Sequence, residues 1–240
     1  MKTVASLYLL ICLIGCPVLT LGQKKSDVWT EWSKKDAEKL LSSSPWAQTQ
    51  VETDLTEMFY SPTSNRGGLN ASGRAQQGAT NQEVTLSYHI RFFSARPIRQ
   101  ALARLYQLQR QPAGEELQGL ESFANAVPEK VIIVTVSYES SDGRTAGRAM
   151  QIFESAVTGT LKNKAYLERK DGSRVFLQEY VPPGKDGFGA RFVFPRFLQE
   201  RPFITDDSGE VRFYAELAEA MKVNMRFSVS QMKYNNQLEY

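Results

Sequence analysis

Both cysteines of this 240-residue chain, Cys12 and Cys16, lie in an apolar N-terminal segment, and no cysteine follows them. Once that segment is removed, the chain has no disulfide to close a loop and no thiolate to bind a metal. The fold must then be stabilised by the burial of its apolar side chains. His89 is the only histidine, so cysteine nucleophiles and sites made of several imidazoles are excluded from the folded part.

Residues 1–22 have the pattern of an export signal. Lys2 supplies the positive start, Val4–Ile14 is a nearly continuous apolar run, and Thr20–Gly22 places small or modest side chains before a cleavage point. We therefore expect a signal peptide over residues 1–22, with Gln23 as the new N-terminus.

Two alternatives to this cleavage stay open. Leu13-Ile14-Gly15-Cys16 resembles a bacterial lipobox, in which Cys16 is the lipid attachment site and becomes the first residue. The apolar run could also stay uncut, because about 20 apolar residues span a bilayer, although Pro17 interrupts it. The two favoured routes place the protein outside the cytoplasm, periplasmic or secreted, with membrane contact only through the leader or a lipid anchor on Cys16.

The charge that remains after cleavage is nearly balanced. Without the leader, 218 of the 240 residues remain, and the loss of Lys2 leaves 28 basic against 26 acidic residues, a net charge of +2. Proteins that bind nucleic acid concentrate positive charge against the phosphates. We therefore expect no nucleic-acid partner, and a length that suffices for one well-packed core.

Residues 23–60 are expected to form a helical and extended N-terminal arm. A helix is predicted over Trp29–Ser44, because Ser33-Lys34-Lys35-Asp36 has the form of a capping box and Trp32 precedes it as in a hydrophobic staple. Pro45 ends this helix.

Trp46–Tyr60 is predicted to be extended, with Val51 and Leu55 on a face that can be buried. The next segment, residues 61–82, is rich in Ser, Asn, Gly, Gln and Ala. Such a composition buries too little apolar surface to offset the entropy of ordering. We interpret residues 61–82 as a flexible low-complexity loop.

Residues 83–240 are expected to form a single α+β domain. Alternation of apolar and polar residues predicts a strand over Val84–Phe92, and a β-branched run predicts a central strand over Val131–Tyr138. Two helices are predicted between them, one with Pro97 in its first turn and one over Glu115–Ala126. A strand, two helices and a strand in this order suggest a crossover, so we expect the two strands to pair in parallel.

The helix that begins near Pro97 is predicted to be amphipathic. Its apolar stripe includes Ile98 and Leu102. Four arginines fall on the opposite arc, where we expect solvent: Arg96, Arg99, Arg104 and Arg110.

The rest of the domain is predicted to be mostly β. A third helix is expected over Thr145–Thr158, and Asp171-Gly172 predicts a hairpin between strands at Leu161–Arg169 and Arg174–Val181. Further strands are predicted at residues 191–194, 211–217, 223–229 and 232–240. The expected fold class is α+β: a mixed, mostly antiparallel sheet with about three helices, preceded by a helical N-terminal arm.

Three segments carry a resemblance to known proteins. They are Trp32–Leu41 with Ser44–Ala47, Phe192–Arg196, and Met232–Tyr234 leading to Leu238. Together they look like a family of exported bacterial proteins of unknown function. The resemblance covers most of the chain after the leader and implies a bacterial envelope or secreted location, but it brings no activity, cofactor or catalytic residue with it.

Few side chains are arranged for catalysis. His89 lies on the polar face of its strand beside Ser87 and Arg91, and we interpret it as a partly exposed strand histidine rather than the base of a Ser-His-Asp triad. Ser230 and Lys233 have S-x-x-K spacing, but positions i and i+3 of a strand point to opposite faces. We therefore expect this match to be accidental.

Paired carboxylates are the one catalytic route that the composition leaves open. Glu52 and Asp54 would share a strand face, and Asp206–Glu210 groups three acids that could hold a hard cation. Asp, Ser and Gly are also the residues that a tight turn requires, and the turn is our interpretation of this segment.

Two further features could make contacts. Gly184–Gly189 is rich in glycine but lacks the spacing of a phosphate-binding loop, so it is predicted to be a mobile hairpin loop. Trp29, Trp32 and Trp46 could form an aromatic platform for a sugar or a partner, although burial in the core is the usual role of tryptophan.

The sequence assigns no catalytic, cofactor-binding or metal-binding residue. Our first hypothesis is a non-enzymatic exported protein that binds an envelope protein or a glycan, or has a structural role there. The alternative is a carboxylate-dependent hydrolase acting on a glycan, which requires two acids about 5–10 Å apart in a cleft.

Overall fold

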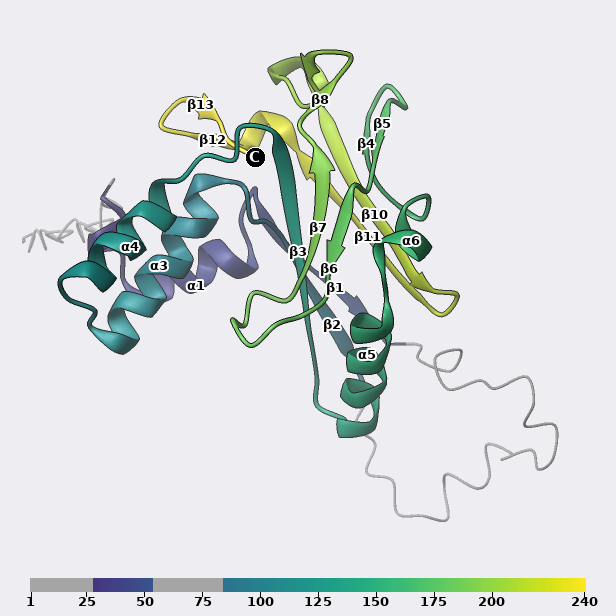
Figure 1. Ribbon diagram of the computed structural model, residues 1–240, viewed down its shortest axis with the longest axis horizontal. Helices are drawn as coiled ribbons and strands as arrows, with labels where there is room; N and C mark the ends of the chain where they lie inside the picture. Colours follow the sequence, from purple (N-terminus) through teal and green to yellow (C-terminus); the bar gives the residue numbers. More distant parts are fainter. Residues whose placement is uncertain (1–27, 54–83) are drawn as a thin grey trace, which may run out of the picture.

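The computed structural model of the protein describes residues 28–53 and 84–240. In these residues the chain forms two antiparallel sheets, a group of three helices beside them and another helix, α5 (Gly143–Ser155), at their lower end (Figure 1). The expectation of an α+β fold with antiparallel sheets is confirmed. The predicted signal peptide, Cys16 and the predicted loop at 61–82 lie outside the described residues.

Five α-helices are present in the described part of the chain. They are α1 (Lys34–Ser42), α3 (Arg96–Arg110), α4 (Glu115–Asn125), α5 (Gly143–Ser155) and α6 (Thr158–Leu161). Short 3-10 turns occur at η1 (Trp29–Glu31), η3 (Asp206–Ser208) and η4 (Val229–Gln231).

The strands form two main sheets and two small hairpins. The five-stranded sheet has the order β1 (Ala47–Glu52), β2 (Leu86–Phe92), β3 (Val131–Ser140), β7 (Ala190–Pro195), β6 (Glu179–Val181). The four-stranded sheet has the order β11 (Met221–Ser228), β10 (Glu210–Ala218), β4 (Ala165–Arg169), β5 (Arg174–Phe176). The hairpins are β8 (Phe197–Leu198) with β9 (Arg201–Pro202), and β12 (Lys233–Tyr234) with β13 (Gln237–Leu238).

Apolar side chains on the inner faces hold the two sheets together. Every second residue of β2, from Leu86 to Phe92, is buried, as the alternation of its sequence predicts. The ring of Phe92 packs edge-to-face on Phe227 of β11, with centroids 4.9 Å apart. Phe192 of β7 packs in the same way on Phe213 of β10, at 5.3 Å. The core therefore lies between the sheets, and the opposite face of the five-stranded sheet, its outer face, carries the polar positions.

The two sheets are joined along both long edges. On one side the chain passes from one sheet to the other between β5 and β6. The Leu177 amide bonds the carbonyl of Ala165 in β4, whereas the next amide, that of Gln178, bonds the carbonyl of Val193 in β7. On the other side the side-chain amide of Gln50 in β1 donates to the Lys222 carbonyl at 2.9 Å and accepts from the Asn224 amide at 2.7 Å. A single side chain thus replaces a rung of backbone pairing between β1 and β11.

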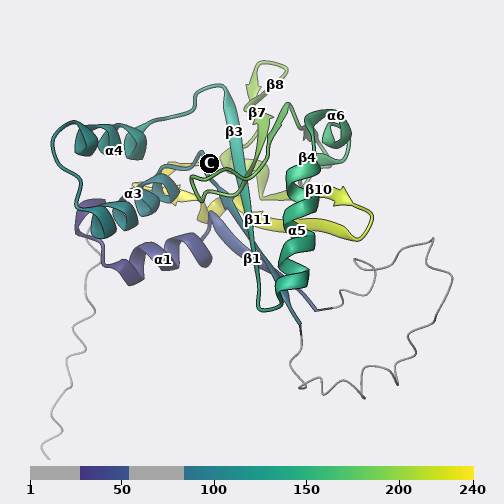
Figure 2. The same ribbon diagram turned by 60° about the horizontal axis from the view of Figure 1, so that its bottom comes forward.

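The expected parallel pairing of the first two strands of the domain is wrong. β2 and β3 are antiparallel, with Ile90 opposite Val136. The helices between them, α3 and α4, pack against each other beside α1 (Figures 1 and 2). They form a helical hairpin that returns the chain to the end of the sheet that it left, so the next strand must run in the opposite direction.

The segment expected to be an N-terminal arm belongs to the same packed unit wherever it is described. β1 pairs with β2 along its full length, and α1 packs against α3. The predicted cap of α1 is confirmed, since the Ser33 hydroxyl accepts a hydrogen bond from the Asp36 amide at 3.1 Å. Val51 is exposed rather than buried, because β1 is an edge strand, and Leu55 lies outside the described residues.

The C-terminal residues are fixed between α3, β1 and β7. The Glu239 carboxylate, largely buried, lies 2.9 Å from the Arg96 guanidinium. The indole of Trp46 donates to the Glu239 carbonyl at 2.7 Å, and Arg196 stacks on the ring of Tyr240 and donates to its carbonyl at 2.9 Å. Residues 232–240 were expected to add an edge strand, but they form the small β12–β13 hairpin instead.

The third predicted helix, α5, begins at the Asp142 cap, whose carboxylate accepts from the Thr145 amide at 2.7 Å. It ends at Ser155, before the predicted end at residue 158. Its Phe153 ring stacks on Tyr138 at the lower end of the core.

The predicted Asp171-Gly172 hairpin is confirmed as the β4–β5 turn, although α6 replaces the start of the first strand.

A close approach of two backbones fixes the end of the loop between β6 and β7. Gly189 has φ +86°, and a Cβ atom there would lie within 2.8 Å of the carbonyl carbon of Val136 in β3. Both the conformation and the space require glycine at this position.

We predict that Gly189→Ala lowers the free energy of unfolding by about 3 kcal/mol or more, because the methyl group adds steric overlap to a disfavoured φ. The measurement is urea-induced unfolding. The matched control is Gly147→Ala in α5, where a Cβ meets nothing within 4 Å and alanine should stabilise the helix by about 0.5–1 kcal/mol. Equal stability of the two variants would contradict the prediction.

Candidate functional site

His89 joins three neighbouring strands on the outer face. Its Nδ1 lies 3.0 Å from the Thr49 hydroxyl of β1, and its Nε2 lies 3.2 Å from the Glu139 carboxylate of β3. The side chain of Glu139 is 72% exposed, so this contact contributes little to stability. The interpretation of His89 as a partly exposed strand histidine is confirmed, and its partners are a threonine and a glutamate from adjacent strands.

Three of the acids considered for catalysis, Asp206, Glu210 and Glu52, each have a different partner. Asp206 lies 2.8 Å from the ammonium of Lys233, and Glu210 lies 2.6 Å from the guanidinium of Arg226. Glu52 accepts a hydrogen bond from Gln50 at 2.6 Å, and its expected neighbour Asp54 is outside the described residues. Residues 206–208 form the 3-10 turn η3, as the turn interpretation predicts.

The remaining sequence matches are resolved by packing. Ser230 bonds the hydroxyl of Ser228 at 3.1 Å, whereas Lys233 pairs with Asp206, so the S-x-x-K residues do not form a pair. The three tryptophans are buried, and this contradicts an aromatic platform on the surface: Trp29, Trp32 and Trp46 are 8%, 3% and 5% exposed.

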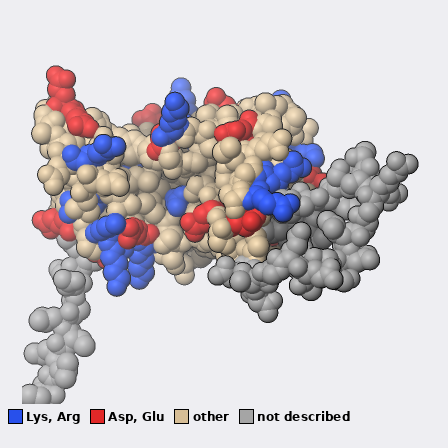
Figure 3. Space-filling view, turned by 90° about the horizontal axis from the view of Figure 1, so that it is seen from below, with Lys and Arg blue, Asp and Glu red and all other residues tan. Residues whose placement is uncertain are grey.

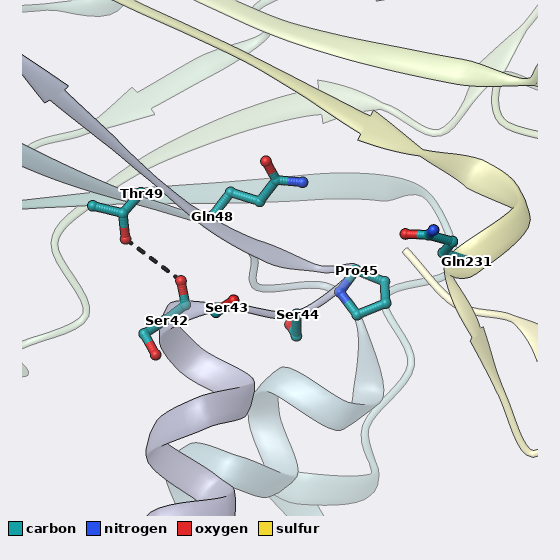
Figure 4. A pocket seen from close by; sticks show the side chains of 7 residues that line it. All are labelled: Ser42, Ser43, Ser44, Pro45, Gln48, Thr49 and Gln231. Carbon is teal, nitrogen blue, oxygen red and sulfur yellow. Dashed lines mark hydrogen bonds between the residues drawn. The ribbon is translucent and has the colours of Figure 1, made fainter.

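A cavity of about 680 Å³ that is open to solvent lies where α1 ends and β1 begins (Figure 4). It is lined by Ser42, Ser43, Ser44, Pro45, Gln48, Thr49 and Gln231. Its hydroxyls serve the helix end: Ser42 donates to the carbonyl of Glu38 at 2.9 Å and Ser44 to that of Leu40 at 2.7 Å. The carbonyl of Leu40 is one of the four that the end of a helix leaves without partners, and the Thr49 hydroxyl bonds another, that of Ser42, at 3.4 Å. We therefore interpret this cavity as a capping turn.

A smaller cavity on the outer face, which we call the Arg91 cleft, has a different character. Its volume is about 110 Å³, and its floor is formed by Arg91 of β2 with Thr135 and Ser137 of β3. Its walls come from α1, the connection between β2 and α3, α3 itself, and the loop between β6 and β7. The residues are Leu41, Phe93, Leu102, Gly187 and Phe188. The cleft is therefore a polar floor between apolar walls.

The walls of the cleft are held in place by aromatic packing. The ring of Phe188 lies 5.2 Å from that of Phe93 and 5.9 Å from that of Phe123 in α4. Gly189, the next residue, is fixed against β3. The glycine-rich loop that the sequence predicts is thus packed over the outer face at its C-terminal end.

Arg91 carries a partly buried charge without a carboxylate partner in the described part of the chain. Its Nε donates to the Leu41 carbonyl at 2.7 Å and its Nη1 to the Ser137 hydroxyl at 2.9 Å. Burial lowers the pKa of Arg91, and the charge of Glu139 opposes this only in part. A buried charge without a counter-ion is costly unless something pairs with it.

Thr135 presents a second polar group at the same place. It is 1% exposed and lines the cleft, and its hydroxyl makes no hydrogen bond with any described residue. It lies directly opposite Arg91 on β2 and Arg191 on β7, whose side chain pairs with Asp186. Buried hydroxyls nearly always have a partner, so the floor of the cleft has both charge and hydrogen-bonding capacity to offer.

Arg99, which is fully buried, shows a contrast with Arg91. Periodicity placed it on the solvent side of its helix, but it is 2% exposed because α3 packs between α1 and α4. Its guanidinium donates to the carbonyls of Phe93, Ser94 and Ala126, and burial lowers its pKa to about 10. Arg99 therefore joins the helix hairpin to the end of β2, whereas Arg91 holds the end of α1 through the Leu41 carbonyl and also lines a cavity.

Basic and acidic side chains lie interspersed on the face shown in Figure 3, so that face does not carry charge of a single sign. Within the described ranges, no three His, Cys, Asp or Glu side chains gather as metal ligands would. None of the described helices has the length and apolar character needed to cross a membrane.

Comparison of the chain with protein-family models, with curated proteins and with solved structures finds no match. The candidate site therefore depends on its own geometry. The sequence analysis missed Thr135 and Ser137 and treated Arg91 only as a neighbour of His89. Strand alternation puts all of them on one face, but only the helices and the loop turn that face into a cleft.

We predict different effects for two arginine substitutions. Arg91→Met should change the free energy of unfolding by less than about 1 kcal/mol, because the lost hydrogen bonds are offset by removal of an unpaired charge. Arg99→Met should cost about 3 kcal/mol or more, because it leaves three carbonyls without their donor. Chemical unfolding measures both, and a large loss for Arg91→Met would mean that Arg91 is a structural residue.

Proposed function

We propose that the protein is a non-enzymatic binding protein of the bacterial envelope that uses the Arg91 cleft as its binding site. The observation that carries the proposal is the partly buried guanidinium of Arg91, which has no carboxylate within ion-pair distance among the described residues. An unpaired, partly buried charge lowers the stability of the folded protein. Groups that lower stability in this way are commonly kept because they bind a ligand.

The geometry favours binding over catalysis in this cleft. A hydrolase that uses two carboxylates needs them on either side of its substrate, whereas the residues that line the Arg91 cleft include no acid. Small-molecule sites typically have apolar walls and a few polar groups that orient the ligand. The cleft has this composition at a reduced size, so it suits a small ligand or the end of a larger one.

The location in the envelope is supported by the leader and by the resemblance to exported bacterial proteins. The mass of the intact protein purified from a bacterial host tests it. We expect a chain that begins at Gln23, with or without cyclisation of that residue, or a lipid-modified chain that begins at Cys16. A protein that keeps Met1 and stays in the cytoplasm would refute the location.

A panel of small acids, bases, sugars, amino acids and phosphates tests the binding function by thermal unfolding. A ligand present at ten times its Kd should stabilise the protein by about 1.4 kcal/mol, which raises Tm by about 3–6 °C for a chain of this size. Leu102→Trp fills the cleft from α3 and should abolish the shift. NMR of the recovered ligand should show it unchanged.

Two results would argue against this function. The cleft is not the binding site if no compound of the panel shifts the Tm of the wild-type protein. The same conclusion follows if a compound raises the Tm of Leu102→Trp as much as that of the wild-type protein. Conversion of the ligand into a product would make the protein an enzyme.

A further inference from the structure

The floor of the Arg91 cleft presents donors that point to an anionic acceptor. Ser137 accepts a hydrogen bond from Nη1 of Arg91, so its own hydroxyl proton is available to a ligand. Nη2 of Arg91 and the Thr135 hydroxyl make no hydrogen bond with any residue in the described ranges. One positive charge and two hydroxyls match the two oxygens of a single carboxylate.

The nearby acids do not neutralise this charge. Glu139 is the acid whose field reaches Arg91, but its carboxylate is largely exposed and lies beside His89. Asp186, in the loop over the outer face, pairs with Arg191. The cleft therefore keeps a net positive charge, and a monoanion would compensate it.

The walls require that the anion carry an apolar group. Leu41, Phe93, Leu102 and Phe188 surround the floor. The cavity of about 110 Å³ has room for about four water-sized groups, at about 30 Å³ each. A carboxylate with two or three methylene or methyl groups fills this space and buries its carbon atoms against the four side chains.

A phosphate fits the same place less well. A dianion would bring a second negative charge and further oxygens that need donors, and apolar walls supply none. Removing such a group from water without pairing is costly. The walls thus discriminate between two anions that the floor alone would accept.

We propose that the Arg91 cleft binds a carboxylate carried on a short apolar chain, with Arg91, Thr135 and Ser137 holding the carboxylate and Phe93 and Phe188 covering the chain. This ligand class rests on the proposed binding function. Two sources share the chemistry: a free short-chain acid, and the C-terminal residue of a peptide with an aliphatic side chain.

NMR titration of the purified full protein tests the proposal with butyrate, butyramide and inorganic phosphate. We expect butyrate to bind at least tenfold more tightly than either butyramide, which lacks the charge, or phosphate, which lacks the apolar chain. N-acetylvaline and its amide form a second arm. Tighter binding of N-acetylvaline than of butyrate would identify a peptide C-terminus as the source, and the reverse order a free acid.

Variants connect the binding to the cleft. Arg91→Met should weaken butyrate binding at least tenfold, and Arg91→Lys should weaken it less because the charge is kept. Thr135→Val has nearly the same shape and should weaken it about threefold or more, without loss of thermal stability. Arg148→Met, on the exposed face of α5, is the matched control and should leave the affinity unchanged.

The outcomes separate this inference from the function on which it rests. Equal or tighter binding of butyramide or phosphate, lost in Leu102→Trp, would refute the carboxylate and keep the binding function. Butyrate binding that persists in Arg91→Met would also refute it. If neither these probes nor the wider panel bind in a way that Leu102→Trp abolishes, the binding function fails as well.

Discussion

The edge-to-face packing of phenylalanines between the two sheets determines where every other element lies. Phe92 on Phe227 and Phe192 on Phe213 fix the inner face of the five-stranded sheet. Because side chains alternate along a strand, fixing that face also fixes the outer one. Arg91, next to Phe92, must then point away from the core. The polar floor of the cleft is thus a direct consequence of how the apolar core is built.

Coverage of the outer face by helices and a loop gives the cleft its chemistry. Without α1, α3 and Phe188, the row of Arg91, Thr135 and Ser137 would be an ordinary solvated sheet surface. Beneath these covering elements, the guanidinium of Arg91 and the hydroxyl of Thr135 lose contact with water, and residues of the described chain replace only part of their hydrogen bonds. The glycine at 189 makes this coverage possible, because only glycine lets the loop approach the backbone of β3 so closely.

Other arginines near the cleft use their guanidinium groups to join parts of the fold, although Nε of Arg96 and of Arg99 is buried without a hydrogen-bond partner. Arg99 donates to three carbonyls, Arg96 pairs with Glu239, and Arg196 binds the C-terminal residue. These three join the helical hairpin and the chain end to the sheets. Arg91 bonds one carbonyl and one hydroxyl and faces a cavity instead. This difference, rather than burial alone, distinguishes a binding group from a structural one.

Local patterns in the sequence predicted most of the helices and strands, one hairpin turn and one helix cap. The alternation over β2, the β-branched run of β3, the Ser33 cap and the Asp171-Gly172 turn depend only on neighbouring residues. The direction of β3 did not follow from them. Whether α3 and α4 cross the sheet or fold back beside it depends on their contacts with α1, which is distant in sequence. For the same reason, periodicity could not show that Arg99 is buried.

What the sequence alone determined is the chemistry available: one histidine, no cysteine after Cys16, and strands whose polar and apolar residues alternate. Tertiary structure alone decided which of those residues matter. Asp206 and Glu210 each pair with a different cation, whereas Arg91 and Thr135 are brought under a shared apolar cover. A binding site needs exclusion of water as well as polar groups, and exclusion of water arises only where segments distant in sequence pack together.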